Sequence, residues 1–567
     1  MENKKIIKLF KLTAELLELH DENPFKVRSY GNAVGALELV EAPLAGMSQP
    51  QLEEIGGVGK GIAAKIVEIN TTGSFEELDQ MLAATPPGVV EMLRIKGIGP
   101  KKVRTIWKEL GTETVEDLLE ACEQDKLSKV KGFGAKTQDN IRQALLFTQQ
   151  NRGKLLYAEA EPAAEELLQQ LKAIFPDTPI ALAGDVRRRM EIVESLQVMV
   201  ATETPDAATA ALNKLDVLAQ EEQASGPWVW RGQHTVSGLS TEIFLVPAAR
   251  FANELLKHSA SAAHLTTIFA AGKSMLSVIR QEDHATEEDI YAAAGMAYVV
   301  PEMREGTTEL QLAMENKLPK LLEQSDLKGS LHNHSTYSDG AHTLEQMATF
   351  LRDAGYGYLG ISDHSKTASY AGGLREGDVL RQQKEVDELN KKLAPFKIFK
   401  GIESDILTDG SLDYEDDILK TFDFVVASVH SVLNMDEKKA TNRLITAIEN
   451  PYTTILGHPT GRLLLRREGY PINHKMVIDA CAVNNVIIEI NANPWRLDLD
   501  WRWVQYAMEK GVLLSINPDA HHTSGYADMK YGVLVGRKGG LTKEMTFNTR
   551  SAEEVEAYFR ERKAKIK

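Results

Sequence analysis

The sequence predicts a multidomain fold with an all-α N-terminal domain, an α+β middle domain and a C-terminal distorted (β/α)7 barrel. The 567 residues are too many for one compact domain. A Gly-x-Gly turn occurs three times in the first 150 residues, each time between helical segments. From residue 321 onward, seven short apolar runs alternate with helical segments. We therefore expect domains at 1–150, 151–320 and 321–567.

Composition excludes several classes of protein. With 43% hydrophobic and 26% charged residues, each domain can bury a core, which excludes a disordered chain. The two cysteines, Cys122 and Cys481, lie too far apart in sequence to form a CxxC pair, which argues against a disulfide framework or a cysteine-rich zinc site. The first 19 residues are amphipathic and contain lysines, and no long apolar run follows. We expect no membrane association and a cytoplasmic location.

Charge is distributed unevenly along the chain. The net charge of −16 argues against a uniformly basic surface for nucleic acid. Residues 1–150 are nearly neutral, however, with 19 Lys and Arg against 22 Asp and Glu, so a local binding face remains open there. Nine of the 14 histidines lie between His332 and His522, which points to metal chemistry in the C-terminal domain.

The three glycine turns predict helix, tight turn, helix units. A Walker A phosphate loop is excluded because Lys60 is followed by Gly61 rather than Ser or Thr, and no strand precedes the turns as a Rossmann fold requires. Free N–H groups at a helix N-terminus favour a phosphate without reading any base. The turns resemble helix-hairpin-helix DNA-binding motifs, although a plain helix–helix corner is the alternative. The glycines are Gly57, Gly59, Gly97, Gly99, Gly132 and Gly134.

The seven runs of the C-terminal domain predict parallel strands, and six of them end in a residue that can bind a metal. In a parallel α/β barrel the C-terminal strand ends share one face, so distant residues can converge there. A single buried histidine is more often a core residue than a ligand, but nine suitable residues in such positions predict a metal centre. Nitrogen and carboxylate ligands suit Zn²⁺ or Mn²⁺. The nine are His332, His334, Asp339, His364, Glu403, His430, His458, Asp519 and His521.

The motifs HNHSTYSDG, ISDHS, GIESD, SVH, GHP and PDAH resemble those of the PHP (polymerase and histidinol phosphatase) phosphoesterase domain over about residues 321–567. One departure is Ser330, where the family usually has Asp, but this is not a ligand position. The resemblance implies three divalent ions, Mn²⁺ or Zn²⁺ with Mg²⁺ as a further candidate, and catalysis through Glu403, His430 and Asp519. It assigns the ligands to three sites: His332, His334, Glu403 and Asp519; Glu403, His430 and His458; and Asp339, His364 and His521.

Such ions would activate a water for in-line attack on a phosphodiester. Arg462, Arg466 and Arg496 follow in nearby loops, where they could bind further phosphates. Ordinary surface arginines are the alternative interpretation.

Three hairpins, an α+β middle and a PHP domain together resemble the bacterial family X DNA polymerase over essentially the whole chain. The segment FKVRSYGNA, with Lys26, Arg28 and Tyr30, resembles the small DNA-end-binding domain of that family. Lys65 matches the family's lyase lysine, which forms a Schiff base with abasic or deoxyribose-phosphate ends. A solvated helix lysine is the alternative.

The nucleotidyltransferase motif of the middle domain is degenerate in this chain. Gly184, Arg187, Arg188 and Glu191 match it, but Asp185 replaces a serine, and Ser195 and Gln197 replace both aspartates of the Asp-x-Asp pair. Two-metal phosphoryl transfer needs those carboxylates, of which Glu242 alone remains. The segment from Lys257 to Ala262 also lacks the expected nucleotide-pocket residues. We expect a polymerase fold retained as a DNA-positioning scaffold.

The sequence thus favours a metal-dependent 3′-to-5′ exonuclease for DNA repair, with abasic-site cleavage as a further activity of the same centre. It would act on gapped, nicked or 3′-ended DNA as a monomer in the nucleoid. The alternatives are an active gap-filling polymerase, a histidinol-phosphate-type phosphatase, and a non-catalytic DNA-end binder.

Overall fold

The computed structural model describes residues 3–38, 40, 42–95, 97–269 and 272–566. The chain divides into two compact units, Met1–Arg152 and Gly153–Lys567. The expected boundary after residue 320 falls inside the second unit and stays a prediction. No helix formed by the described residues is long and apolar enough to cross a membrane.

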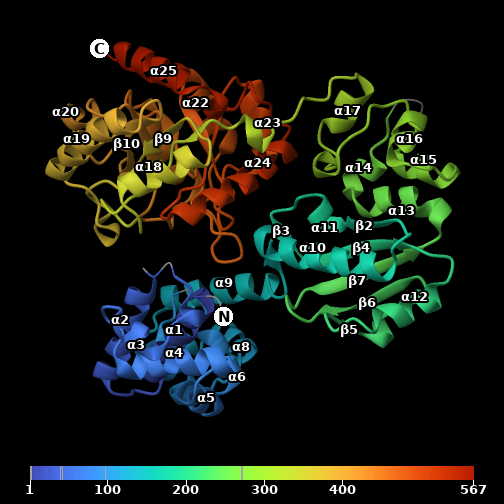
Figure 1. The fold of residues 1–567 in the computed structure, drawn as a ribbon, viewed down its shortest axis with the longest axis horizontal. Coiled ribbons are helices and arrows are strands. Elements are labelled where there is room, and N and C mark those ends of the chain that lie inside the picture. Colours follow the sequence, from blue (N-terminus) through green and yellow to red (C-terminus); the bar gives the residue numbers. More distant parts are fainter. Residues whose placement is uncertain (1–2, 39, 41, 96, 270–271, 567) are drawn as a thin grey trace. The chain divides into compact units, whose positions relative to one another are not determined.

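The first unit is helical throughout its described residues, as the sequence predicts (Figure 1). Its helices pack around one apolar core that includes Phe10, Ile66 and Ile106. The α-helices are α1 (Asn3–Leu19), α2 (Pro24–Glu38), α3 (Gln49–Glu53), α4 (Lys60–Thr72), α5 (Glu76–Ala83), α6 (Pro87–Met92), α7 (Pro100–Leu110), α8 (Val115–Glu123) and α9 (Ala135–Gln150).

The three Gly-x-Gly turns share one backbone geometry. The first glycine of each has a positive φ, 93° at Gly57, 88° at Gly97 and 93° at Gly132, which a residue with a Cβ rarely adopts. The residue between the two glycines is buried in every turn. Each turn is therefore a built corner between two packed helices.

The second glycine of each turn is the N-cap of the next helix. Gly59 precedes α4, Gly99 precedes α7 and Gly134 precedes α9, all with φ near −80°. A Cβ added at any of the three would meet no described atom within 4 Å. These helix N-termini consequently present backbone N–H groups with open space around them.

The middle segment contains a five-stranded sheet in the order β2-β4-β7-β6-β5, in which only β4 and β7 are parallel. A two-stranded sheet of β1 and β3 lies beside α10. The elements are β1 (Leu155–Leu156), α10 (Tyr157–Ile174), β2 (Ile180–Ala183), α11 (Gly184–Arg187), β3 (Ile192–Val193), β4 (Ser195–Ala201), α12 (Pro205–Leu212), β5 (Leu218–Gln220), β6 (Val229–His234) and β7 (Ser240–Val246).

The α+β prediction for the middle segment is confirmed. Strand β2 ends at Ala183, because Gly184 has a φ of 58° and turns the chain into α11. A Cβ at Gly184 would lie 2.3 Å from the Gln197 side chain, so glycine is also needed for space. This turn brings the Arg187 and Arg188 side chains beyond the sheet edge.

A helical section follows the sheet and has its own core, which includes Leu256, Tyr291 and Val299. Arg304 is fully buried there and donates to both Glu287 carboxylate oxygens. The helices are α13 (Phe251–His258), α14 (Ala262–Thr266), α15 (Met275–Gln281), α16 (Glu287–Ala293) and α17 (Glu309–Met314).

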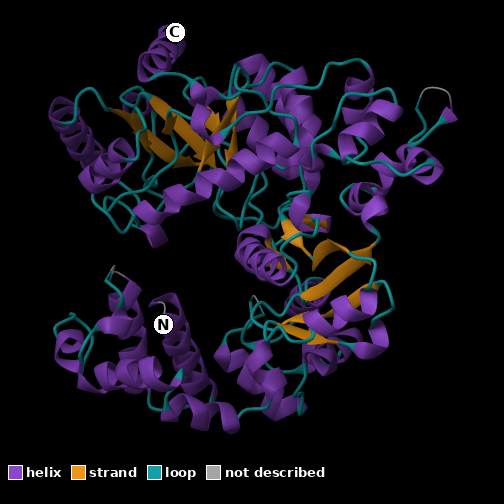
Figure 2. Cartoon of the chain, turned by 45° about the vertical axis from the view of Figure 1, so that its right-hand side comes forward, coloured by secondary structure: helices purple, strands orange, loops and turns teal. Residues whose placement is uncertain are grey.

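The C-terminal segment is a nearly closed barrel of seven parallel strands in sequence order, which confirms the prediction. A parallel bridge between Asn333 and Ala520 joins the segments that follow the first and last strands. Figure 2 shows this barrel and the middle sheet as separate groups of strands. The strands are β8 (Gly329–Ser330), β9 (Tyr358–Ile361), β10 (Lys397–Asp405), β11 (Phe424–Ser428), β12 (Ile455–Leu456), β13 (Ile487–Asn491) and β14 (Leu514–Asn517).

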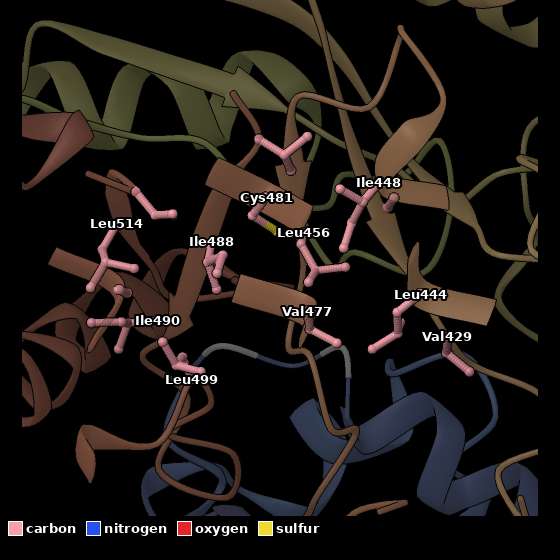
Figure 3. Close-up of a cluster of buried hydrophobic side chains, with 14 of the residues drawn as sticks. Val429, Leu444, Ile448, Leu456, Val477, Cys481, Ile488, Ile490, Leu499 and Leu514 are labelled. Atoms are coloured by element: carbon pink, nitrogen blue, oxygen red, sulfur yellow. The ribbon is translucent and has the colours of Figure 1, made fainter. Parts of the chain in front are cut away.

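Helices cover the outside of the barrel and bury its apolar strands (Figure 1). In Figure 3, Leu444 and Ile448 from α21 and Val477 and Cys481 from α22 lie beside strand residues such as Leu456. The helices are α18 (Leu344–Asp353), α19 (Glu376–Lys392), α20 (Asp416–Leu419), α21 (Glu437–Glu449), α22 (His474–Asn484), α23 (Trp501–Glu509), α24 (Met529–Lys538) and α25 (Ala552–Ala564).

Charged contacts join the middle segment to the barrel within the second unit. The buried Lys538 of α24 pairs with Glu305 at 2.5 Å and donates to the Arg188 carbonyl. Glu191 accepts hydrogen bonds from Trp501 and Arg502 of α23. Because these contacts are largely buried, they fix the middle segment against the barrel.

Candidate metal centre

All nine predicted metal ligands lie at the C-terminal ends of barrel strands or in the loops that follow. His332 and His334 come after β8, and Asp339 lies in the same loop. His364, His430 and His458 follow β9, β11 and β12, whereas Glu403 lies within β10. Asp519 and His521 follow β14. The parallel topology therefore brings residues that span 190 positions of sequence to one end of the barrel.

The donor atoms of these residues form four overlapping groups, in each of which the atoms lie within 4.8 Å of one another. Shared members connect the groups into one polynuclear arrangement. The groups are His334, Asp339, His364 and His521; His332, Glu403 and His458; His332, His334 and Asp519; and His364, Glu403 and His430.

Glu403 is the centre of the arrangement. Its Oε1 atom lies 3.2 Å from His332 Nε2, 3.2 Å from His430 Nε2 and 3.0 Å from His458 Nε2. Its Oε2 atom lies 2.9 Å from His364 Nδ1 and 3.6 Å from His334 Nε2. Each carboxylate oxygen thus faces a different set of histidines, as a bridging ligand requires.

Asp519 and Asp339 hold the other side of the centre. Asp519 Oδ1 lies 3.0 Å from His334 Nε2 and 3.6 Å from His332 Nε2. Asp339 lies 3.4 Å from His521 Nε2 and 3.6 Å from His364 Nε2. Asp519 has a positive φ of 53°, an unusual backbone conformation of the kind that persists at functional sites.

Two carboxylates that the sequence analysis missed orient the histidines. Glu489 accepts from His332 Nδ1 at 2.6 Å, and Asp405 accepts from His430 Nδ1 at 2.6 Å. Each bond leaves the other ring nitrogen, Nε2, directed at Glu403. A carboxylate on the far nitrogen of a ligating histidine fixes its tautomer and raises its basicity. The signal available in the sequence was an acidic residue at or near the C-terminal end of a barrel strand.

Asp363 is a third residue that the sequence analysis missed. It holds the backbone of a loop at the metal centre. This fully buried carboxylate accepts from the Ser335 backbone N–H and hydroxyl, from Ser338 and from Gln382. It thereby fixes the loop that carries His334 and Asp339.

The pKa values in the metal centre reflect two opposing effects, burial and the attraction of neighbouring opposite charges. Burial alone would raise the pKa of Glu403, but His430, His332 and His364 hold it well below its ordinary value. Burial likewise lowers a histidine pKa, yet Glu403 and Asp405 raise that of His430 to about 10. Burial and the neighbouring His521 and His364 lower the pKa of His334 to about 3. Glu403 is therefore ionised, and His334 is neutral as a metal ligand must be.

The donor set fits divalent metal ions. Several buried ring nitrogens have no hydrogen-bond partner among the described residues, namely Nε2 of His332, both nitrogens of His334, and Nδ1 of His364 and His458. An unpaired polar atom is costly in a protein interior, so such a concentration requires a reason. Coordination by nitrogen and carboxylate oxygen supplies one, and suits Zn²⁺ or Mn²⁺.

The three candidate arginines have different environments. Arg496 lies at the centre, with its Nε 3.5 Å from Asp519 Oδ2. Arg466 is exposed and stacks over the Trp495 ring at 3.5 Å. Arg462 differs from the expectation, because its guanidinium already donates to the carbonyls of Arg496 and Leu497 and to Asp500. All three guanidinium nitrogens are thus engaged with the protein, and two of these bonds support the backbone of Arg496 and Leu497.

The residues that match the nucleotidyltransferase motif of the middle segment, together with their partners, are called the middle pocket below. Their polar side chains are already paired with other groups of the protein. Gln197 Nε2 donates to Glu242 Oε2 at 2.8 Å, and Arg231 Nε donates to Oε1 of the same residue at 2.8 Å. Asp185 accepts from the Glu194 backbone N–H, and burial raises its pKa. Ser195, at the start of β4, adds no carboxylate. The structure thus shows Glu242 neutralised by protein groups.

Both arginines of the middle motif also have carboxylate partners. Arg187 forms a bidentate pair with Glu287, and Arg188 forms one with Glu305. Arg187 and Arg304 lower the pKa of Glu287 to about 2, in spite of its burial.

In the first unit, Lys65 and Lys26 meet at one carboxylate. Lys65 Nζ lies 3.3 Å from Glu77 Oε2 and 5.8 Å from the Tyr30 ring centroid. Lys26 pairs with the other Glu77 oxygen, and Tyr30 donates to Glu77 at 2.6 Å. Lys26 and Lys65 are therefore close together, and the Glu77 carboxylate balances their charge. Arg28 is exposed on α2.

Comparisons with known proteins match these parts of the chain. A helix-hairpin-helix domain family matches residues 1–75, a SAM-like helix-hairpin-helix tandem family matches residues 89–145, and the PHP domain family matches residues 330–493. The "Probable phosphatase" of Thermoanaerobacter sp. (strain X514) is 28% identical over 246 residues, which is 41% of this chain and 95% of that protein. A "Probable phosphatase" of Acetivibrio thermocellus is 27% identical over 42% of this chain and 96% of its own length.

A longer match extends through all three segments. The "DNA polymerase/3'-5' exonuclease PolX" of Bacillus subtilis (strain 168) is 34% identical over 571 residues, which is 99% of this chain and 100% of that protein. The chain therefore belongs to the bacterial PolX-type family X DNA polymerase/3′-5′ exonuclease family, with helix-hairpin-helix domains followed by an α+β region and a C-terminal PHP domain.

Proposed function

We propose that this chain is a metal-dependent 3′-to-5′ exonuclease that acts on gapped, nicked or 3′-ended DNA, with an inactive polymerase pocket. The observation that carries the proposal is the convergence of eight other candidate metal ligands around Glu403 at one end of the barrel. The relative from Bacillus subtilis, whose name includes 3'-5' exonuclease, supports the choice of reaction. Cleavage at abasic sites is a second reaction that the same centre would perform.

The centre would hold three divalent ions, Mn²⁺ or Zn²⁺ with Mg²⁺ as the third candidate. The groups of donor atoms support His332, His334 and Asp519 as ligands of one ion and Asp339, His364 and His521 as ligands of another. Glu403 Oε1 lies 3.2 Å from His430 Nε2 and 3.0 Å from His458 Nε2, which supports these three residues as ligands of the third. When bound, such ions supply the positive charge that polarises a phosphodiester and activates water. The described residues supply eight further ring nitrogens and carboxylate groups around Glu403, which remains ionised and can bridge.

The residues of the chain itself would orient the substrate. Arg496 can donate to a non-bridging phosphate oxygen while its Nε stays near Asp519. Arg466 is free to reach a phosphate further along the strand, because its side chain is exposed over Trp495. Glu489 and Asp405 keep the imidazoles in place throughout.

Inactivity of the polymerase pocket is supported by its charge balance. A triphosphate with two dications needs uncompensated carboxylates, but Glu242 is shared by Gln197 and Arg231, and Ser195 carries no charge. An active polymerase is the second candidate, because the name of the Bacillus subtilis relative also includes DNA polymerase. The matches to phosphatases favour a small-molecule phosphoesterase, which the helix-hairpin-helix domains argue against.

One gel separates these functions. A 5′-labelled primer in a gapped duplex is incubated with the full chain, Mn²⁺ and all four dNTPs. Shortening that depends on Mn²⁺ supports the exonuclease. Extension by the Glu403→Gln variant, in which degradation is removed, would establish the polymerase instead. An unchanged primer retained on a binding gel would establish a non-catalytic DNA-end binder.

The helix-hairpin-helix turns would bind backbone phosphates. Gly59 and Gly99 are suitable test positions because a side chain there meets no described atom within 4 Å, so folding is preserved while phosphate approach is blocked. We expect Gly59→Leu with Gly99→Leu to weaken binding of gapped DNA and to flatten its salt dependence. Gly46→Leu, at an exposed and open position of the same unit outside the three turns, is the control. Equal loss in both proteins would contradict phosphate binding at the turns.

We further propose that Lys65 forms a Schiff base with abasic or deoxyribose-phosphate ends, assisted by Lys26. Its partial burial between the Tyr30 and Phe75 rings supports a reactive amine more than a solvated one. Borohydride should trap an abasic oligonucleotide on the wild-type chain and not on Lys65→Ala. An adduct that persists in this variant removes Lys65 from the reaction.

A further inference from the structure

Tyr370 is a large aromatic residue that is exposed beside the metal centre. Its side chain is 71% exposed, and its ring centroid lies 6.2 Å from that of His364. A single exposed aromatic side chain is common on a protein surface. What distinguishes Tyr370 is that its ring stands beside a candidate metal ligand.

The turn that carries Tyr370 is anchored on both sides. It is the 3-10 turn η8 (Ser369–Ala371). Ala368, directly before the turn, and Ala371, its last residue, are both buried. Thr367 precedes the turn and donates its hydroxyl hydrogen to Asp405 or Asp413, both within 3.0 Å. The backbone on the N-terminal side is therefore fixed to a carboxylate that also orients His430.

The C-terminal side of the turn is equally fixed. The Leu374 N–H donates to the His364 carbonyl at 2.8 Å, which ties the end of the turn to a candidate metal ligand. A Cβ at Gly373 would lie 1.9 Å from the Ser365 carbonyl oxygen, so the two strands of this loop touch. The loop consequently presents the Tyr370 ring in one defined place.

The Tyr370 ring is uncharged and lies beside the His364 imidazole at the metal centre. A flat uncharged ring at this place suits the face of a nucleobase, because every base has a π-face.

We propose that Tyr370 stacks on the nucleobase of the 3′-terminal nucleotide, so that the centre prefers ends that carry a base over ends that lack one. This inference rests on the proposed exonuclease function. Stacking on an aromatic ring tolerates all four bases, which suits an enzyme that must shorten any sequence. Tyr370 would act as a specificity residue that positions the terminal phosphodiester near Arg496.

The test compares two oligonucleotides that differ only in the terminal base. One ends in thymidine and the other in an abasic tetrahydrofuran residue, and kcat/KM is measured for each with Mn²⁺. We expect Tyr370→Ala to reduce the preference for the base-bearing end by about 5- to 150-fold. Tyr370→Phe keeps the ring and should restore the preference. Trp228→Ala, which removes a half-exposed aromatic of the middle segment, is the matched control.

Three outcomes would overturn the inference. Equal losses for Tyr370→Phe and Tyr370→Ala would assign the effect to the hydroxyl group. Equal losses on both oligonucleotides would show that Tyr370 supports the loop only. An unchanged preference in Tyr370→Ala would show that the ring contacts no base.

A binding measurement separates this inference from the proposed function. A 2-aminopurine at the 3′ terminus is quenched when it stacks, whether or not the chain hydrolyses DNA. Quenching by the wild-type chain that is lost in Tyr370→Ala and kept in Tyr370→Phe supports stacking even if no exonuclease is found. Absence of quenching in the wild-type chain overturns stacking even if the exonuclease is active.

Discussion

The middle pocket and the metal centre both gather carboxylates, but the groups that face those carboxylates differ. In the middle pocket, Glu242 is held by Gln197 and Arg231, and Glu287 by two arginines. In the metal centre, Glu403 is faced by five histidines. An arginine stays protonated at any working pH, so it neutralises its partner permanently. A histidine can release its proton and present a lone pair to a metal.

The carboxylates of the middle pocket thus have permanent protein partners, whereas those of the metal centre face side chains that can also coordinate ions. This difference predicts opposite responses to mutation. Removing a carboxylate from the middle pocket leaves buried cations unpaired and costs stability. Removing one from the metal centre destroys the ligand set, so the loss is chiefly in activity.

The largest effect is expected for Glu403→Gln. The variant should lose hydrolysis to the background level while it keeps most of its affinity for DNA, because an amide cannot bridge dications as a carboxylate does. Its metal content, measured by mass spectrometry, should fall with the activity. Glu415→Gln, at an exposed position of the same barrel, is the control. If Glu403→Gln shortened DNA at the wild-type rate, hydrolysis would not depend on the metal centre.

A smaller effect, on stability, is expected for Glu287→Gln. The pKa of Glu287 is held at about 2, below its ordinary 4.5, so its ion pairs stabilise the fold fully above pH 4.5 and lose this contribution as the pH falls toward 2. The variant should lower the free energy of unfolding by about 3 kcal/mol at pH 6 and by less at pH 3.5. Chemical denaturation of the full chain, followed by tryptophan fluorescence, measures the difference.

The control for this prediction is Glu315→Gln, which removes an exposed carboxylate paired with Lys317. Its unfolding midpoint should shift far less than that of Glu287→Gln. A difference between wild type and Glu287→Gln that grows in acid would contradict the stated direction of the pKa shift.

A third prediction concerns Gln197→Asp, which restores one missing carboxylate of the middle motif. Without metal, the variant places two carboxylates together and removes the hydrogen bond to Glu242, so we expect a loss of about 1 to 2 kcal/mol in the free energy of unfolding. Mn²⁺ should recover part of it. Gln197→Ala loses the same bond without added charge and should show no recovery beyond that of the wild type, whose metal centre also binds ions.

The sequence was sufficient to predict the barrel, its strand order and the nine side chains that meet in the metal centre. Each motif stands at a strand end, and parallel strands bring their ends to one face. Glu489, Asp405 and Asp363 were missed because each acts on a partner that is distant in sequence. For Glu489 and Asp405 the partner is a histidine, and for Asp363 it is a loop. The same limit applies to Glu77, which pairs with Lys65 only once α4 and α5 have packed.

Arginine partners were equally hidden from the sequence. Arg462 and Arg496 occupy similar loop positions, and both were predicted to bind phosphate. Only the fold shows that the Arg462 guanidinium is enclosed by two carbonyls and Asp500, whereas the Arg496 guanidinium reaches Asp519. Arg462 thus resembles the middle pocket although it belongs to the barrel.

The smallest effect is expected for Arg462→Lys, which tests that resemblance. Glu191 of the middle segment holds Arg502, Arg502 contacts Asp500, and Asp500 accepts from Arg462, which supports the Arg496 backbone. A lysine has one nitrogen in place of a planar fork and cannot make all three of these bonds.

We expect Arg462→Lys to lower kcat/KM on a single-stranded oligonucleotide about fivefold, chiefly through KM, because Arg496 is displaced but the ligands are intact. Glu302→Gln is the control, since Glu302 pairs with Arg537 across the same contact between middle segment and barrel without reaching Arg496. A loss as large as that of Arg496→Ala would mean that Arg462 itself binds phosphate. No loss would mean that Arg462 does not set the position of Arg496. The metal centre would then be independent of the contacts that Glu191 of the middle segment makes.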